Sequence, residues 1–114
     1  MTPTTGEIWW VDFGVKQPRR PAKRRPAVVV APFESDEWDY QNFVMIPLTK
    51  RFREKPSEVH LLPTIENGLP VQCWAQCELS TSMPSIMLLE KIGVVDPDTW
   101  QRIRWILRTF MGFD

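Results

Sequence analysis

The spacing of the hydrophobic residues changes only once along this chain, close to its C-terminal end. Before that point they come in short runs rich in β-branched and aromatic side chains, which predict strands. These runs span residues 7–13, 26–33, 42–49, 57–62, 70–79 and 91–95. After it, large side chains recur at helical spacing, at Trp100, Ile103, Ile106, Leu107 and Phe110. Because helices do not alternate with strands, a βαβ fold is excluded, and a strongly bent sheet with one covering helix is expected.

Local signals define the borders of several elements. Asp96-Pro97 is typical of a helix start, and Gly112 is suited to end that helix. Asn67-Gly68 predicts a turn, and residues 83–88 suggest a helical turn. Pro47 has no N–H to give to a sheet, which indicates an edge or bulge position.

Length and composition limit the class of protein. A chain of 114 residues is expected to form one domain over residues 1–114, and a hydrophobic content of 43% with six tryptophans can fill its interior. No apolar run reaches the roughly 18 residues that span a bilayer, and no secretory signal is visible, so a cytoplasmic protein is expected. Cys73 and Cys77 suit buried thiols. With His60 as the only histidine there is no set of four zinc ligands, and no cofactor is expected.

Positive charge is concentrated in one part of the chain. Six of the ten residues from 16 to 25 are Lys or Arg, although the formal net charge is zero. A second basic segment, residues 50–55, follows the predicted strand 42–49, and ten of the fourteen Lys and Arg residues lie between positions 16 and 55. Such local concentration is typical of a polyanion-binding site. The alternative is a pair of solvated loops that balance the acidic segment at residues 34–39.

Short motifs, in their order and spacing, resemble one known family over nearly the whole chain. They are Gly-Glu-Ile-Trp-Trp-Val-Asp-Phe at 6–13, Arg-Pro-Ala-Val-Val-Val-Ala-Pro-Phe at 25–33, Ile-Pro-Leu-Thr at 46–49, and Asn-Gly-Leu at 67–69 before Ala75-Gln76. They resemble the MazF/PemK toxins, the endoribonuclease halves of bacterial type II toxin–antitoxin systems. The resemblance implies a mainly β, small SH3-like barrel of the CcdB/MazF type with a C-terminal helix. It also implies a homodimer in the bacterial cytoplasm and a MazE-like antitoxin.

RNA can be cleaved without a metal if its own 2′-hydroxyl attacks the adjacent phosphate. The protein must then stabilise a charged phosphorane, and a planar guanidinium that contacts two phosphate oxygens suits that task. The resemblance places the catalytic arginine at Arg25 and a phosphate-contacting hydroxyl at Thr49. Threonine is too weakly basic to remove a proton at neutral pH, so a hydrogen-bonding role is expected for Thr49 and the general base is unassigned. From the residues alone, Arg25 could simply end a basic loop and Thr49 could cap a strand.

Two basic loops beside Arg25 and Thr49 would form a groove for single-stranded RNA. The residues expected to bind RNA are Lys16, Arg19, Arg20, Lys23, Arg24, Lys50, Arg51, Arg53 and, through the resemblance, Gln76. Trp9, Trp10 and Trp74 could stack on unpaired bases, although core packing is expected for at least two of them. Trp100 and Trp105 are assigned to the buried seam of the helix or its margins, and His60 to the surface.

The chain departs from the family at acidic positions. Many relatives have an acid in the loop before the Arg-Pro motif, and many have Asp where this chain has Ala75. The acid and base of the reaction and the cleaved sequence are therefore left unassigned. Two other function classes stay open: a CcdB-like toxin of the same fold that poisons DNA gyrase, and a non-catalytic SH3-like nucleic-acid-binding module.

Overall fold

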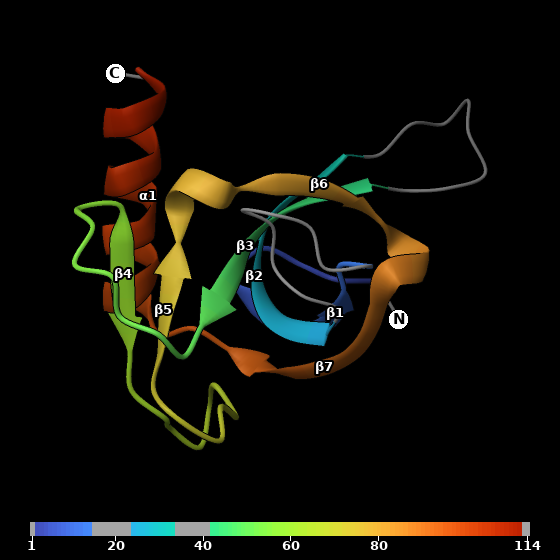
Figure 1. Ribbon diagram of the computed structural model, residues 1–114. Coiled ribbons are helices and arrows are strands. Elements are labelled where there is room, and N and C mark those ends of the chain that lie inside the picture. Colours follow the sequence, from blue (N-terminus) through green and yellow to red (C-terminus); the bar gives the residue numbers. More distant parts are fainter. Residues whose placement is uncertain (1, 15–23, 34–41, 113–114) are drawn as a thin grey trace.

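The computed structural model describes residues 2–14, 24–33 and 42–112, and Figure 1 shows the arrangement of their elements. The strands are β1 (Glu7–Asp12), β2 (Arg24–Phe33), β3 (Asn42–Thr49), β4 (Glu58–Leu61), β5 (Cys73–Gln76), β6 (Thr81–Pro84) and β7 (Leu88–Val94). Two single 3₁₀ turns, Cys77–Leu79 and Ser85–Met87, flank β6, and the helix α1 (Pro97–Met111) ends the chain. No helix in these ranges is both long and apolar enough to span a bilayer.

The strands form one antiparallel sheet that curls into a barrel (Figure 1). Its order is β4-β5-β3-β2-β1-β7, and β6 pairs with β3. The short turn Ser85–Met87 joins β6 to β7, so the circle β3-β2-β1-β7-β6 returns to β3. The mainly β barrel with a C-terminal helix expected from the sequence is confirmed.

Hydrophobic side chains fill both faces of the curled sheet. One cluster lies between the sheet and α1 and includes Ile8, Val28, Ile46 and Ile103. The other consists of Trp9, Val11, Ala27, Val29, Phe43 and Met45, the alternate positions of the same three strands. Strand alternation therefore gives β1, β2 and β3 two buried faces, which explains their nearly continuous hydrophobic sequences.

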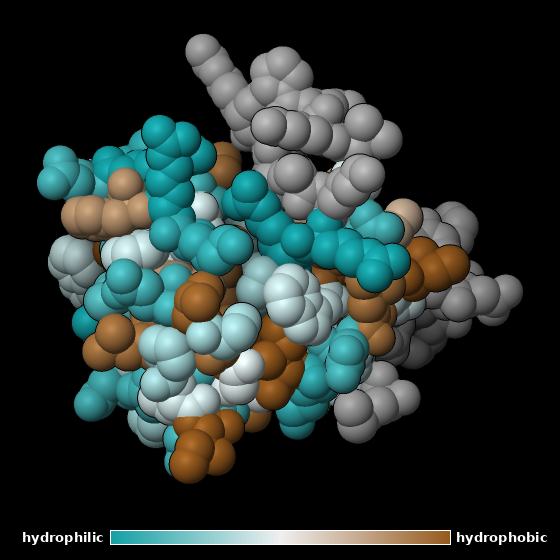
Figure 2. Space-filling view, turned by 60° about the horizontal axis from the view of Figure 1, so that its bottom comes forward, coloured by the Kyte–Doolittle hydropathy of each residue, from teal (hydrophilic) through white to brown (hydrophobic). Residues whose placement is uncertain are grey.

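The ends of α1 are those predicted. The side chain of Asp96 accepts a hydrogen bond from the Thr99 N–H at 3.1 Å, and Gly112 closes the helix at φ 76°. Ile103 and Ile106 are buried against the sheet. Of the two tryptophans assigned to the buried seam or its margins, Trp100 packs on the cluster under α1, whereas Trp105 is 65% exposed and lies outside the seam. Exposed hydrophobic side chains form separate groups among hydrophilic ones on the face shown in Figure 2.

Three predicted elements need correction. The strand expected over residues 70–79 is only Cys73–Gln76, because β5 pairs with β3 and β4 only along this stretch. The helical turn expected at 83–88 is shorter, since Thr81–Pro84 pairs with β3 as a strand. The last strand begins at Leu88 and not at Lys91.

Pro47 lies inside the central strand β3, where an edge or bulge was expected. The position is tolerated because β6 pairs with β3 only as far as Met45, whereas β5 pairs from Leu48 onward. One side of β3 is thus without a registered partner at Pro47, although β2 pairs with it on the other side, through Ala27. A proline can occupy such a local gap without removing a sheet hydrogen bond.

The turn at Asn67-Gly68 packs tightly on β7. The Val94 N–H donates to the Glu66 carbonyl at 2.9 Å. A Cβ added to Gly93 would lie 2.3 Å from that carbonyl oxygen, so no larger residue fits there without moving the loop. Asn67 is itself buried, and its side-chain oxygen accepts from the Thr64 and Leu69 N–H groups, both at 3.0 Å.

Glu7 links β1 to β7 through a buried carboxylate. It accepts hydrogen bonds from the Thr4 N–H at 2.8 Å and the Trp9 indole at 3.0 Å, and it pairs with Lys91 at 2.9 Å. Burial by itself would raise the pKa of Glu7, but these partners outweigh it and lower the pKa from 4.5 to about 2.

Acid is therefore expected to weaken the fold through Glu7. Because the folded-state pKa is depressed, this contribution is complete above pH 4.5 and is lost as the pH falls toward 2. The shift corresponds to about 3 kcal/mol of unfolding free energy. Urea unfolding of a Glu7→Gln variant between pH 2 and 7 should show lower stability at neutral pH and a flatter acid limb. Glu90→Gln, an exposed position on β7, is the control, and a Glu7→Gln acid limb as steep as the wild type would contradict the assignment.

Candidate functional site

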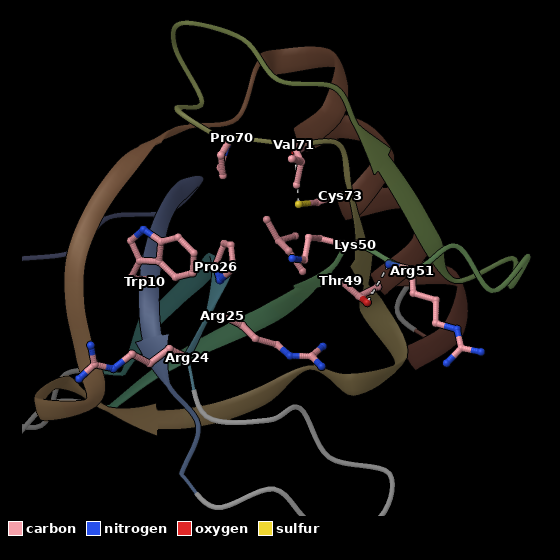
Figure 3. Close-up of a pocket in the computed structure, with 11 residues that line it drawn as sticks. Trp10, Arg24, Arg25, Pro26, Thr49, Lys50, Arg51, Pro70, Val71 and Cys73 are labelled. Carbon is pink, nitrogen blue, oxygen red and sulfur yellow. Dashed lines mark hydrogen bonds between the residues drawn. The ribbon is translucent and has the colours of Figure 1, made fainter.

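A pocket of about 630 Å³ opens where β2 begins and β3 ends (Figure 3). Its cationic lining comes from the ends of both strands and its apolar lining from β1, β3 and the segment that leads into β5. The lining residues are Trp10, Arg24, Arg25, Pro26, Leu48, Thr49, Lys50, Arg51, Pro70, Val71 and Cys73. The described lining contains four cations and no carboxylate, so the pocket is suited to an anion.

The sheet register brings Arg25 and Thr49 together. β2 and β3 pair Ala27 with Pro47, and two residues further toward the pocket come Arg25 in one strand and Thr49 in the other. In Figure 3 the Arg25 guanidinium points toward the side on which Thr49 lies, whereas the Arg24 side chain leaves β2 in the opposite direction. The two residues selected from the sequence thus share one pocket although they are far apart in the chain.

Arg25 is half-buried, and its environment favours contact with an anion. Burial lowers the pKa of its guanidinium, and the positive charge of nearby Arg53 lowers it further. Arginine nevertheless remains protonated at neutral pH. A cation that is partly desolvated and lies near another cation is stabilised when a phosphate binds to it.

The Thr49 hydroxyl is buried and already has one partner. Its oxygen accepts from the Arg51 N–H at 3.1 Å, drawn as a dashed line in Figure 3. Thr49 therefore does cap the strand end, as the alternative from the residues alone held. Its hydroxyl hydrogen can still be donated to a ligand, so both roles are compatible.

The other predicted cations fall into three groups. Arg24, Lys50 and Arg51 line the pocket, and Arg53 is close enough to act on Arg25. Lys55, outside the pocket, pairs with Glu78 at 3.2 Å. The remaining predicted RNA-binding residues, Lys16, Arg19, Arg20 and Lys23, lie outside the described residues, as does the acidic segment at 34–39.

Gln76 is too deeply buried to contact an RNA bound in the pocket. Its side chain is 1% exposed, it does not line the pocket, and it pairs with Glu58 in the β4–β5 register. Its Oε1 atom has no hydrogen-bond partner among the described residues. The prediction that Gln76 binds RNA is corrected by this burial.

Sequence reasoning missed the apolar side of the pocket. Pro70 and Val71 line the pocket from a loop, whereas the sequence predicts a strand there and gives no sign of a pocket wall. Cys73 also lines the pocket, and burial raises the pKa of its thiol while Lys50 opposes that rise. Trp10, one of the three tryptophans that could stack on bases, reaches the pocket, whereas Trp9 is buried on the other face.

Fold and site together define a small antiparallel barrel with a C-terminal helix and a cationic pocket at its strand ends. Residues 4–111 match the family described as PemK-like, MazF-like toxin of type II toxin-antitoxin system. The chain belongs to this family.

Solved structures show the same fold. An endoribonuclease in complex with its cognate antitoxin from a mycobacterial species matches with a TM-score of 0.75 at 19% identity, over 99% of this chain and 98% of that one. The Mycobacterium tuberculosis toxin MazF-mt6 matches with a TM-score of 0.73 at 18% identity, over 95% and 98%. A MazE–MazF structure from Deinococcus radiodurans matches with a TM-score of 0.72 at 20% identity, over 100% and 99%.

Proposed function

We propose that this protein is a toxin endoribonuclease that cleaves single-stranded RNA without a metal ion. The observation that carries the proposal is the meeting of Arg25 and Thr49 in one cationic pocket. The 2′-oxygen of the RNA attacks the adjacent phosphorus and loses its proton, while the bond from phosphorus to the 5′-oxygen breaks. The products are a 2′,3′-cyclic phosphate and a 5′-hydroxyl end, which takes up a proton.

In this proposal Arg25 stabilises the transition state. Charge builds on the non-bridging phosphate oxygens as the phosphorane forms, and a guanidinium donates two hydrogen bonds to them in a fixed plane. Thr49 donates its hydroxyl hydrogen to the same phosphate. The described lining of the pocket holds no carboxylate or imidazole, so the acid and the base are left unassigned there.

We further propose a MazE-like antitoxin as partner and a homodimer as the active assembly. Support for the antitoxin comes from two matched structures, which are complexes of a toxin with its antitoxin. An acidic antitoxin segment would be attracted by the cations that attract RNA.

The direct test is incubation of the purified protein with a long RNA, with and without a chelator. Fragments with 5′-hydroxyl ends that form equally well in the presence of chelator are expected. Cleavage that stops with the chelator would contradict the metal-independent step. Binding of RNA without cleavage would point to a nucleic-acid-binding module, and inhibition of DNA gyrase without RNA cleavage to a CcdB-like toxin.

RNA binding is expected to depend strongly on salt through the basic segment after β3. Arg51→Gln with Arg53→Gln should weaken binding to all RNA sequences alike and make the logarithmic salt slope shallower, by roughly 0.7 for each phosphate that the protein no longer neutralises. Fluorescence anisotropy over a salt series measures both effects. Arg104→Gln with Arg108→Gln, two exposed cations on α1, is the control of equal charge. A sequence-selective loss at unchanged slope would mean that Arg51 and Arg53 read bases.

A further inference from the structure

Three aromatic rings stack on the surface beside the pocket and have no role in the chemistry described above. The rings of Phe52 and Trp74 are 5.3 Å apart between centroids, at an interplanar angle of 25°. Those of His60 and Trp74 are 4.8 Å apart, at 17°. Trp74 therefore contacts both of the other rings.

The sheet register connects this stack to the candidate catalytic residues. Thr49 of β3 pairs with Trp74 of β5, which in turn pairs with His60 of β4. Directly opposed residues of neighbouring strands have their side chains on the same face. The row therefore begins at Thr49 and continues outward across two strands, at about 4.8 Å for each.

Two of the three rings are exposed, and they differ in what holds them. Trp74 is half-buried, whereas Phe52 is 54% exposed and His60 is exposed as well. The His60 ring is fixed by a hydrogen bond of 2.9 Å between its Nε2 and the Gln72 side chain. Trp74 and His60 thus support Phe52, whose ring has an open surface.

The sequence around Phe52 indicates the kind of ligand. Phe52 lies in Lys50-Arg51-Phe52-Arg53, three residues after Thr49, so a cation stands on either side of it in the sequence. Single-stranded nucleic acid is bound by this combination of cations for phosphates and an aromatic face for a base. An exposed ring set only for a hydrophobic protein surface would not need a cation on either side.

We propose that Phe52 is a base-stacking residue, and that it binds the base of a nucleotide next to the one whose phosphate faces Arg25. Trp74 and His60 are positioning residues that hold the Phe52 ring. This inference rests on the proposed function, since it names a subsite for the same RNA substrate. Stacking on Phe52 accepts any base, so it adds affinity and fixes the path of the strand.

Binding of a short 2′-O-methyl RNA oligonucleotide tests the stack independently of cleavage, because this probe has no free 2′-hydroxyl. Phe52→Ala is expected to weaken its binding about fivefold to a hundredfold, the usual range for one stacked base. Phe52→Tyr keeps the ring and should bind as the wild type does. Phe110→Ala, on α1, is the matched control, since Phe110 is 58% exposed.

A second series locates the base. One abasic residue is moved along the probe, and at one position it should weaken binding to the wild type but not to Phe52→Ala. His60→Ala should give part of the Phe52→Ala loss, and His60→Phe should restore binding because a ring again supports Trp74. Loss of affinity without such coupling to an abasic position would overturn the stacking role.

The outcomes separate this inference from the proposed function. If the wild type cleaves no RNA but binds the probe through Phe52, the endoribonuclease proposal fails and the stacking subsite stands. If the wild type cleaves RNA and Phe52→Ala binds the probe no worse than Phe110→Ala, the subsite is overturned and the endoribonuclease stands. A changed oligomeric state of Phe52→Ala with unchanged affinity would also overturn it, because the ring would then serve a protein contact.

Discussion

Arg25→Ala is expected to remove most RNA cleavage, by about a hundredfold to a thousandfold or more, while the protein stays folded and still binds RNA. Loss of one donor that stabilises charge in a transition state typically has this effect on turnover. RNA binding should survive because Arg24, Lys50 and Arg51 also line the pocket. Single-turnover cleavage rates, anisotropy and thermal unfolding of the variant measure the three quantities.

Matched variants show whether the Arg25→Ala result reflects a role in catalysis or only in phosphate binding. Arg24→Ala removes the neighbouring guanidinium, which points away from Thr49, and should lower affinity more than turnover. Arg25→Lys keeps the charge but not the two-point contact, so it should recover only part of the rate. Thr49→Val should slow cleavage less than Arg25→Ala does. Near-normal turnover of Arg25→Ala would reduce Arg25 to a phosphate anchor.

Phe43→Ala is expected to lower the free energy of unfolding by about 3–5 kcal/mol, the usual range for a large side chain removed from a core. Phe43 is 0% exposed and belongs to the cluster that Trp9, Val29 and Met45 form inside the barrel. Strands from both sides of β3 meet around it, since Phe43 pairs with Pro32 of β2 and Met83 of β6. Urea unfolding followed by tryptophan fluorescence measures the loss.

Phe110→Ala serves as the control for this stability measurement as well. The Phe110 side chain is 58% exposed, so its removal should change the free energy of unfolding by less than about 0.5 kcal/mol. A Phe43→Ala loss as small as that expected for Phe110→Ala would mean that the interior cluster contributes little, and that the barrel is stabilised mainly through the cluster under α1.

Local signals in the sequence were enough to predict the elements whose structure depends on residues nearby in the chain. The helix begins and ends at its capping residues, and the hydrophobic run at 42–49 is the strand Asn42–Thr49. β6 could not be found in this way. Its four residues, Thr81–Pro84, have two exposed and two half-buried side chains and no alternating pattern. It is a strand because β3, about forty residues earlier in the chain, offers it backbone partners.

In the candidate site too, residues that follow from local signals could be predicted, whereas those that depend on tertiary contacts could not. Arg25 and Thr49 were predicted because each stands at the end of a recognisable strand, and the register then carries both to one pocket. Gln76 was misjudged because β5 ends at that residue and the chain turns into Cys77–Leu79, which leaves the side chain inside. The stack on Trp74 combines three segments, so only the tertiary fold reveals it.

The close packing of the Asn67-Gly68 turn on Gly93 has a consequence for protein engineering. One wall of the pocket, Pro70 and Val71, follows this turn after a single residue, the buried Leu69. Insertions before Gly68 would have to displace backbone that lies within van der Waals contact of β7, and would be tolerated poorly. Pro70 and Val71 are exposed and carry no such restraint. A library meant to change what the pocket admits should therefore vary the composition and length of the chain at these two positions and leave residues 66–68 and Gly93 intact.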